Sequence, residues 1–187
     1  MRIDFPSAAI GAGAVVVAAG LVAGTICALG VYDVGADAPH WAATRSLIAY
    51  VRERSIALRV RGVVVPDLST PERITDGASD YDAMCTSCHL APGMAENEMR
   101  PGLYPKPPRL AVVPAAPPAE QFWIIKHGIK MSGMSAWGKT HSDNEIWSMV
   151  AFLQKLPSLS PAQYRAIVQA ASGHHERDGA GHMEMGR

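Results

Sequence analysis

The pentapeptide Cys85-Thr86-Ser87-Cys88-His89 decides how the rest of the sequence is interpreted. Cys-x-x-Cys-His is the attachment pattern for c-type haem. On one helical turn the two thiols lie on the same side, where each can add to a haem vinyl group, and the adjacent imidazole can reach the iron. A thioredoxin-like dithiol does not need this histidine, and a zinc site needs further ligands at regular spacing. The motif predicts one covalent haem c, with Cys85 and Cys88 binding the porphyrin and His89 the iron.

Composition excludes several other classes of protein. The chain has 187 residues, and its 17 basic and 17 acidic side chains give zero net charge, so a generally basic nucleic-acid-binding protein is excluded. Apolar residues make up 48% of the chain, enough for a buried core. Hydrolytic chemistry has no support, because the sequence shows no nucleophile–base pair and no carboxylate pair. These observations support neither a nucleic-acid-binding function nor a hydrolytic one.

The N-terminus contains a long uncharged segment, from Ala8 to Val31. A helix of this length spans about 36 Å, enough for the hydrocarbon core of a bilayer. A cleaved signal peptide is the alternative, but its apolar region usually has about 7–15 residues. We therefore predict an uncleaved membrane anchor over residues 1–36, in which Cys27 is an apolar filler.

Residues 37–61 are predicted to form a second helix, with Asp37 as its cap and Pro39 in its first turn. Between residues 41 and 61 there are five arginines and one glutamate. One face is apolar and carries Leu47, Val51 and Leu58. Such a basic amphipathic helix could lie on anionic headgroups or pack on the soluble domain. With the linker that follows, it occupies residues 37–71.

The clearest helix of the soluble part covers residues 142–156. Ser142 and Glu145 form a capping box, and Pro157 ends the helix. The apolar positions recur with helical period and make one face, formed by Ile146, Met149, Val150 and Leu153.

Around the motif, residues 74–156 resemble the membrane-anchored monohaem class I cytochromes c of bacteria. Residues 77–84 look like the first helix of that family, residues 107–110 like its proline-x-leucine loop, and residues 120–130 like its third helix. The resemblance implies an all-α haem domain over residues 72–157, with the last helix packed across the first. It also implies that the Pro108 carbonyl accepts a hydrogen bond from the second ring nitrogen of His89, which would fix the ring tautomer.

A second axial ligand is expected from residues 131–138, Met-Ser-Gly-Met-Ser-Ala-Trp-Gly. A thioether suits haem iron, and paired with histidine it raises the reduction potential. The resemblance favours Met134 over Met131, because residues 134–137 align with the family's Met-Pro-aromatic-like segment. Ser135 stands where that family commonly has proline. His127 and His141 are the alternative ligands.

The C-terminal segment, residues 158–187, is predicted to contain one short helix followed by a flexible tail. The tail is rich in potential metal ligands, which are His174, His175, His182, Met183 and Met185. Histidine and methionine together suit copper. The alternative is a soluble tail without a metal.

Charge is unevenly distributed in spite of the zero total. Residues 67–98 contain seven acids and one base, whereas residues 100–139 contain six bases and one acid. Lys126, Lys130 and Lys139 are expected near the methionine side of the haem. They would steer the domain to an acidic docking patch on a redox partner.

The resemblance implies electron transfer between membrane or periplasmic partners. Because that family acquires its haem outside the cytoplasm, we expect a bacterial inner-membrane protein whose haem domain faces the periplasm. The chain could be a free carrier or a subunit of a respiratory complex. Two other functions stay open: a haem-based sensor or enzyme with a labile Met134 ligand, and a copper-handling redox protein that uses the tail.

Overall fold

The computed structural model describes residues 5–181, with side chains described for residues 9–171. Throughout this part of the chain the regular structure is helical and no strand occurs, which confirms the all-α prediction. The chain divides into two compact units, residues 1–40 and 41–187.

Among its described residues, 5–40, the first unit has the helix α1 (Phe5–Ala28). Its segment Ala9–Ala28 has a mean hydropathy of 2.2 and is not buried, so it is long and apolar enough to cross a membrane. After this helix, the Tyr32 hydroxyl lies 2.7 Å from Nδ1 of His40, and the two rings stack.

The second unit begins with α2 (Ala42–Arg59). The predicted start at Asp37 is wrong, because a turn closed by the Ala38 amide and the Gly35 carbonyl occupies that position. Pro39 also disfavours helical backbone at the residue before it. The helix instead begins after Trp41, whose side chain makes no capping hydrogen bond.

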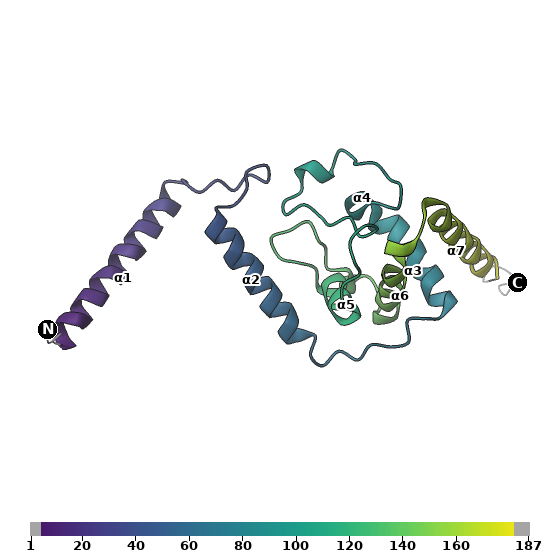
Figure 1. The fold of residues 1–187 in the computed structure, drawn as a ribbon, viewed down its shortest axis with the longest axis horizontal. Helices are drawn as coiled ribbons and strands as arrows, with labels where there is room; N and C mark the ends of the chain where they lie inside the picture. Colours follow the sequence, from purple (N-terminus) through teal and green to yellow (C-terminus); the bar gives the residue numbers. More distant parts are fainter. Residues whose placement is uncertain (1–4, 182–187) are drawn as a thin grey trace, which may run out of the picture. The chain divides into compact units, whose positions relative to one another are not determined.

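The core of the second unit forms where α3 (Pro71–Met84) crosses α6 (Asp143–Lys155). The predicted capping box of α6 is confirmed: the Glu145 amide donates to Ser142 Oγ, and the Ser142 amide donates to the Glu145 carboxylate. All residues from 146 to 153 are buried, because neighbouring helices cover α6 on several sides. Figure 1 shows α3, α5 (Pro118–His127), α6 and α7 (Pro161–Gly181) gathered into one bundle.

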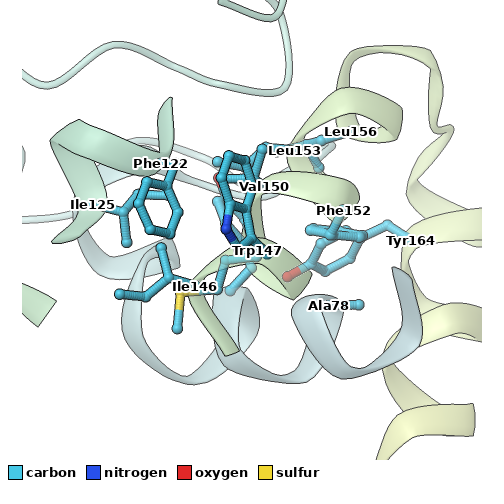
Figure 2. Packing of buried hydrophobic residues seen from close by; sticks show 12 residues of the cluster. Ala78, Phe122, Ile125, Ile146, Trp147, Val150, Phe152, Leu153, Leu156 and Tyr164 are labelled. Carbon is cyan, nitrogen blue, oxygen red and sulfur yellow. The ribbon is translucent and has the colours of Figure 1, made fainter. Parts of the chain in front are cut away.

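Aromatic side chains join these helices. The rings of Phe122 on α5 and Trp147 on α6 stack with centroids 4.1 Å apart (Figure 2). On the other side of α6, Phe152 contacts Tyr164 of α7 and Tyr81 of α3. One of these ring pairs is stacked and two are tilted, and aromatic contacts of this kind add to the stabilisation that burial provides.

The last helix is longer than the sequence predicted. Ser160 and Gln163 cap its start in the same reciprocal way as the box of α6. Tyr164 and Ala171 are buried, so α7 packs on the domain, and the helix then continues to Gly181. Packing of its first turns stabilises a helix that the polar, glycine-containing sequence does not favour.

Candidate functional site

The Cys-x-x-Cys-His motif lies on a short helix, α4 (Thr86–His89), directly after α3. The amides of Cys88 and His89 both donate to the Cys85 carbonyl, so the motif forms one turn. Both thiols are free and partly buried. Burial, followed by the nearby charges of Asp80 and Cys88, raises the pKa of the Cys85 thiol to about 12. The surroundings of Cys85 thus favour an uncharged sulfur, which suits a thioether bond.

The His89 ring is held by a backbone carbonyl. Its Nδ1 lies 2.9 Å from the carbonyl oxygen of Pro108, as the resemblance implied. A carbonyl only accepts hydrogen bonds, so Nδ1 carries the proton and Nε2 keeps its lone pair for a metal. Burial lowers the pKa of His89, and this lowering outweighs the opposite effect of the Pro108 bond. The neutral, ligating form of the ring is therefore the favoured one.

Two side chains that the sequence analysis missed bind the carbonyls of the α4 turn. Nδ2 of Asn97 donates to the Ser87 carbonyl at 2.6 Å, and the Arg100 guanidinium donates to the Cys88 carbonyl at 3.0 Å. The terminal carbonyls of a helix lack partners within it and need such donors. The asparagine Oδ1 in turn accepts from the amide of Arg100, where η1 (Arg100–Gly102) begins.

Arg100 also reaches the loop that binds His89. It is only 1% exposed, and its second guanidinium nitrogen donates to the Pro107 carbonyl at 2.9 Å. Glu96 accepts from its Nε at 3.2 Å and also pairs with Lys106. One buried guanidinium therefore joins the residue before His89 to the residue before Pro108. In the sequence, Arg100 is only one of the six basic residues between positions 100 and 139. Its role becomes visible only from its burial, which the sequence does not show.

The residue that follows the motif has an uncommon backbone conformation. Leu90 has φ 62°, although it is not glycine, and only 1% of its surface is exposed. With ψ 157° this backbone lies in a region that is almost reserved for glycine and costs about 1–3 kcal/mol. Burial of the side chain and a 2.6 Å hydrogen bond from the Tyr81 hydroxyl to the Leu90 carbonyl hold it in place. The strain lets the chain turn away directly after His89.

The two candidate methionines differ in their surroundings. Met131 is 78% exposed, whereas Met134 is partly buried and packs against the hydrophobic core. Ser132 braces the loop, because its hydroxyl donates to the Ile129 carbonyl and accepts from the Met134 amide. The loop then enters η2 (Trp137–Lys139). Met134, and not Met131, therefore packs against the apolar interior of the domain.

Gly128 is what lets this loop fold back on α5. Its φ is 65°, and a β-carbon there would lie 2.6 Å from the Met134 carbonyl oxygen. The Ile129 amide then donates to that same carbonyl at 3.1 Å. The close approach therefore requires glycine for both its backbone angle and its missing side chain.

The other candidate ligands are placed less favourably or are not described. His127 is exposed and contacts the Trp123 ring, and His141 contacts the Trp137 ring and bonds to Thr140. The tail positions, His174, His175, His182, Met183 and Met185, lie outside the described side chains. Within the described residues, no group of three histidine, cysteine or acidic side chains could hold a metal ion.

A cavity lies behind the ring of His89, between residues 89–93, 109–112 and the start of α7. Its volume of about 180 Å³ is below the roughly 300–1,000 Å³ of ligand pockets. We assign no ligand to it. By contrast, the donor set of α4 fits a covalent haem: two sulfurs on one turn, and a neutral imidazole whose other nitrogen is already bonded.

The fold and this donor set define the class of protein: residues 72–153 form a c-type cytochrome haem domain. More specifically, these residues match the family "Cytochrome C oxidase, cbb3-type, subunit III". The match covers less than half of the chain and includes the motif, Pro108 and Met134. Comparison with the curated proteins and with the solved structures found no significant match.

Proposed function

We propose that this chain is a membrane-tethered electron-transfer protein with one covalent haem c and His89/Met134 axial ligation. The observation that carries the proposal is the α4 turn, in which His89 has Nδ1 bonded to Pro108, inside a segment that matches a cytochrome family. When bound, the haem supplies a one-electron iron couple. The protein supplies sulfur for attachment, an oriented imidazole and a thioether, and these ligands set the potential.

The domain order supports this proposal. We assign residues 1–36 to an anchor, 37–71 to a basic helix and linker, 72–157 to the haem domain, and 158–187 to a C-terminal helix and tail. Helix α1 has the length and hydropathy of a span. The family match favours export of the haem domain to the periplasmic side of a bacterial inner membrane, where it would pass electrons as a free carrier or as a subunit of an oxidase complex.

A redox partner with an acidic docking patch fits the exposed Lys130 and Lys139. Lys126 contributes less to this surface than the sequence suggested, because its Nζ lies 2.6 Å from the Asp143 carboxylate. An electron-transfer rate that does not change with ionic strength would contradict steering by these lysines.

The test of ligation is an optical titration of the haem-loaded full chain and of two methionine variants. We expect the wild type to show the weak sulfur-to-iron band when ferric and not to bind carbon monoxide when ferrous. Met134→Ala should lose the band and bind carbon monoxide. Met131→Ala is the matched control, since this methionine is exposed, and should behave as the wild type.

Other outcomes would contradict parts of the proposal. If the wild type lacks the sulfur band and binds carbon monoxide readily, Met134 is not a firm ligand, and the sensor or enzyme function replaces electron transfer. If Met131→Ala alone loses the band, the assignment of the ligand is wrong. If the double variant Cys85→Ala/Cys88→Ala retains haem after denaturation as well as the wild type does, covalent attachment at α4 is wrong.

A further inference from the structure

Helix α2 has two functional faces, and one of them packs on the haem domain. Ile56 is 8% exposed on the side where α2 contacts α5. On the same side, the Arg59 guanidinium lies 6.0 Å from the centre of the Trp123 ring, within the range of a cation–π contact. This inner face makes α2 part of the same compact unit as the haem domain.

The opposite face of α2 is apolar and exposed. Leu47, Val51 and Leu58 are 64%, 55% and 59% exposed, and their spacings of four and seven place them on one side of the helix. Tyr50 is 62% exposed beside them. Exposed apolar side chains gathered on one helix face mark a surface that is covered in the working protein. We call Leu47, Tyr50, Val51 and Leu58 the outer face.

The charges next to the outer face indicate what covers it. Helix α2 contains four arginines and one acid, Glu53, which pairs with Arg52. Arg54 is exposed and, by helical spacing, lies among the residues of the outer face, whereas Arg45 is exposed on the opposite side of the helix; Arg61 follows the helix. Exposed apolar side chains with an exposed arginine among them fit an interface of acyl chains and anionic headgroups, because the arginine stem can lie along the apolar surface while its charge reaches the headgroups. A protein partner would have to supply both an apolar groove and acidic side chains around it.

Chain length brings this helix close to a membrane. Only residues 29–41 separate α1 from α2, and 13 residues span at most about 45 Å when fully extended. If α1 crosses the bilayer, the start of α2 therefore cannot leave its vicinity. The short tether gives the bilayer surface a high effective concentration at the outer face.

We propose that the outer face of α2 lies in the headgroup region of an anionic membrane, and that its inner face thereby holds the α5 side of the haem domain towards that membrane. The inference rests on the proposed anchoring by α1. It adds an orientation: the haem domain does not swing freely on its linker, because α2 is fixed to the lipid by one face and to α5 by the other.

Spin labels on the haem-loaded full chain in lipid nanodiscs test this proposal. Cys27→Ala removes the thiol that haem attachment does not use, and single cysteines are then placed at Val51, Leu58, Glu53 or Ala18. Glu53 is the matched control, since it lies on the same helix outside the outer face. Ala18 lies in the middle of α1 and reports on the anchor. The measured quantity is the ratio of collisions with oxygen, which enters lipid, to collisions with a water-soluble nickel complex.

In phosphatidylglycerol-rich discs we expect this ratio to be several-fold higher at positions 51 and 58 than at position 53, and to fall in discs of phosphatidylcholine alone. Equal ratios at 51, 53 and 58, with a lipid-like ratio at 18, would overturn the inference and leave the anchor intact. A water-like ratio at 18 would instead overturn the anchoring, and the inference with it. Labels at 51 and 58 that are shielded from both reagents would indicate a protein surface on the outer face, which also overturns it.

Discussion

A β-carbon at Gly77 would overlap the backbone carbonyl of Ser148, because α3 and α6 cross with their backbones in direct contact at this point. Ala78 and Tyr81, on the same face of α3, are 0% and 1% exposed. The crossing supports the site, since α4 follows α3 immediately and the methionine loop leads into α6.

Gly77→Ala should therefore be strongly destabilising. The added methyl group meets a main-chain carbonyl that cannot rotate away, so we expect a loss of about 3 kcal/mol in unfolding free energy, at the upper end for overpacking. Denaturant unfolding of the haem-loaded chain measures it. Gly62→Ala is the control, because nothing lies within 4 Å of a β-carbon there. If Gly77→Ala lost less unfolding free energy than the control variant, the helices would not cross at Gly77.

Gly128→Ala should weaken the bond between Met134 and the haem iron more than it lowers the stability of the fold. Alanine is strained at φ 65°, and its β-carbon would push on the Met134 carbonyl. We expect the sulfur-to-iron band to weaken and carbon monoxide binding to increase. Gly133→Ala, in the same loop, is the control, because its β-carbon meets only the end of the Leu103 side chain at 3.2 Å. Equal spectra for the two variants would show that Gly128 does not position the loop.

Arg100→Met should destabilise the domain by about 3 kcal/mol, because it removes the donors to the partly buried Cys88 and Pro107 carbonyls and breaks the contact of a buried guanidinium with Glu96. It should also shift the reduction potential, since the two segments that orient His89 lose their connection. Arg100→Lys should recover part of the stability, and Arg109→Met, at an exposed position, should have little effect. Unfolding and redox titrations measure both. An unchanged potential would limit Arg100 to a structural role.

The capping box of α6 should make the free energy of unfolding depend on pH in the acidic range. Hydrogen bonds from Ser142 lower the pKa of Glu145 below its ordinary value of 4.5. The charged carboxylate therefore contributes stability above about pH 4.5, and this contribution is lost as the pH falls through the lowered pKa. Glu145→Gln should be less stable than the wild type at pH 7, and the difference should disappear once the pH has fallen below the lowered pKa of Glu145. Glu98→Gln, at an exposed position, is the control; an identical pH dependence for both variants would contradict the role of the cap.

The sequence alone determined the features that local chemistry controls. The Cys85–His89 motif, the capping box at Ser142 and the apolar helix near the N-terminus depend on residues a few positions apart, so their patterns are readable without a fold. The resemblance supplied Pro108 and Met134. The structure confirms the contact of the Pro108 carbonyl with the His89 ring, and it packs Met134 against the core, whereas ligation of the iron by Met134 stays a prediction.

The tertiary structure decided what distant segments do together. Arg100 looks like a surface base until its burial and its bonds to Cys88 and Pro107 are seen. Gly77 and Gly128 matter only because another backbone approaches each of them. Helix α2 begins later and α7 runs further than their sequences indicate, because turns and packing override weak helix propensity. Local pattern predicts which residues can form an element, and only the packed chain determines which surfaces, charges and carbonyls then face each other.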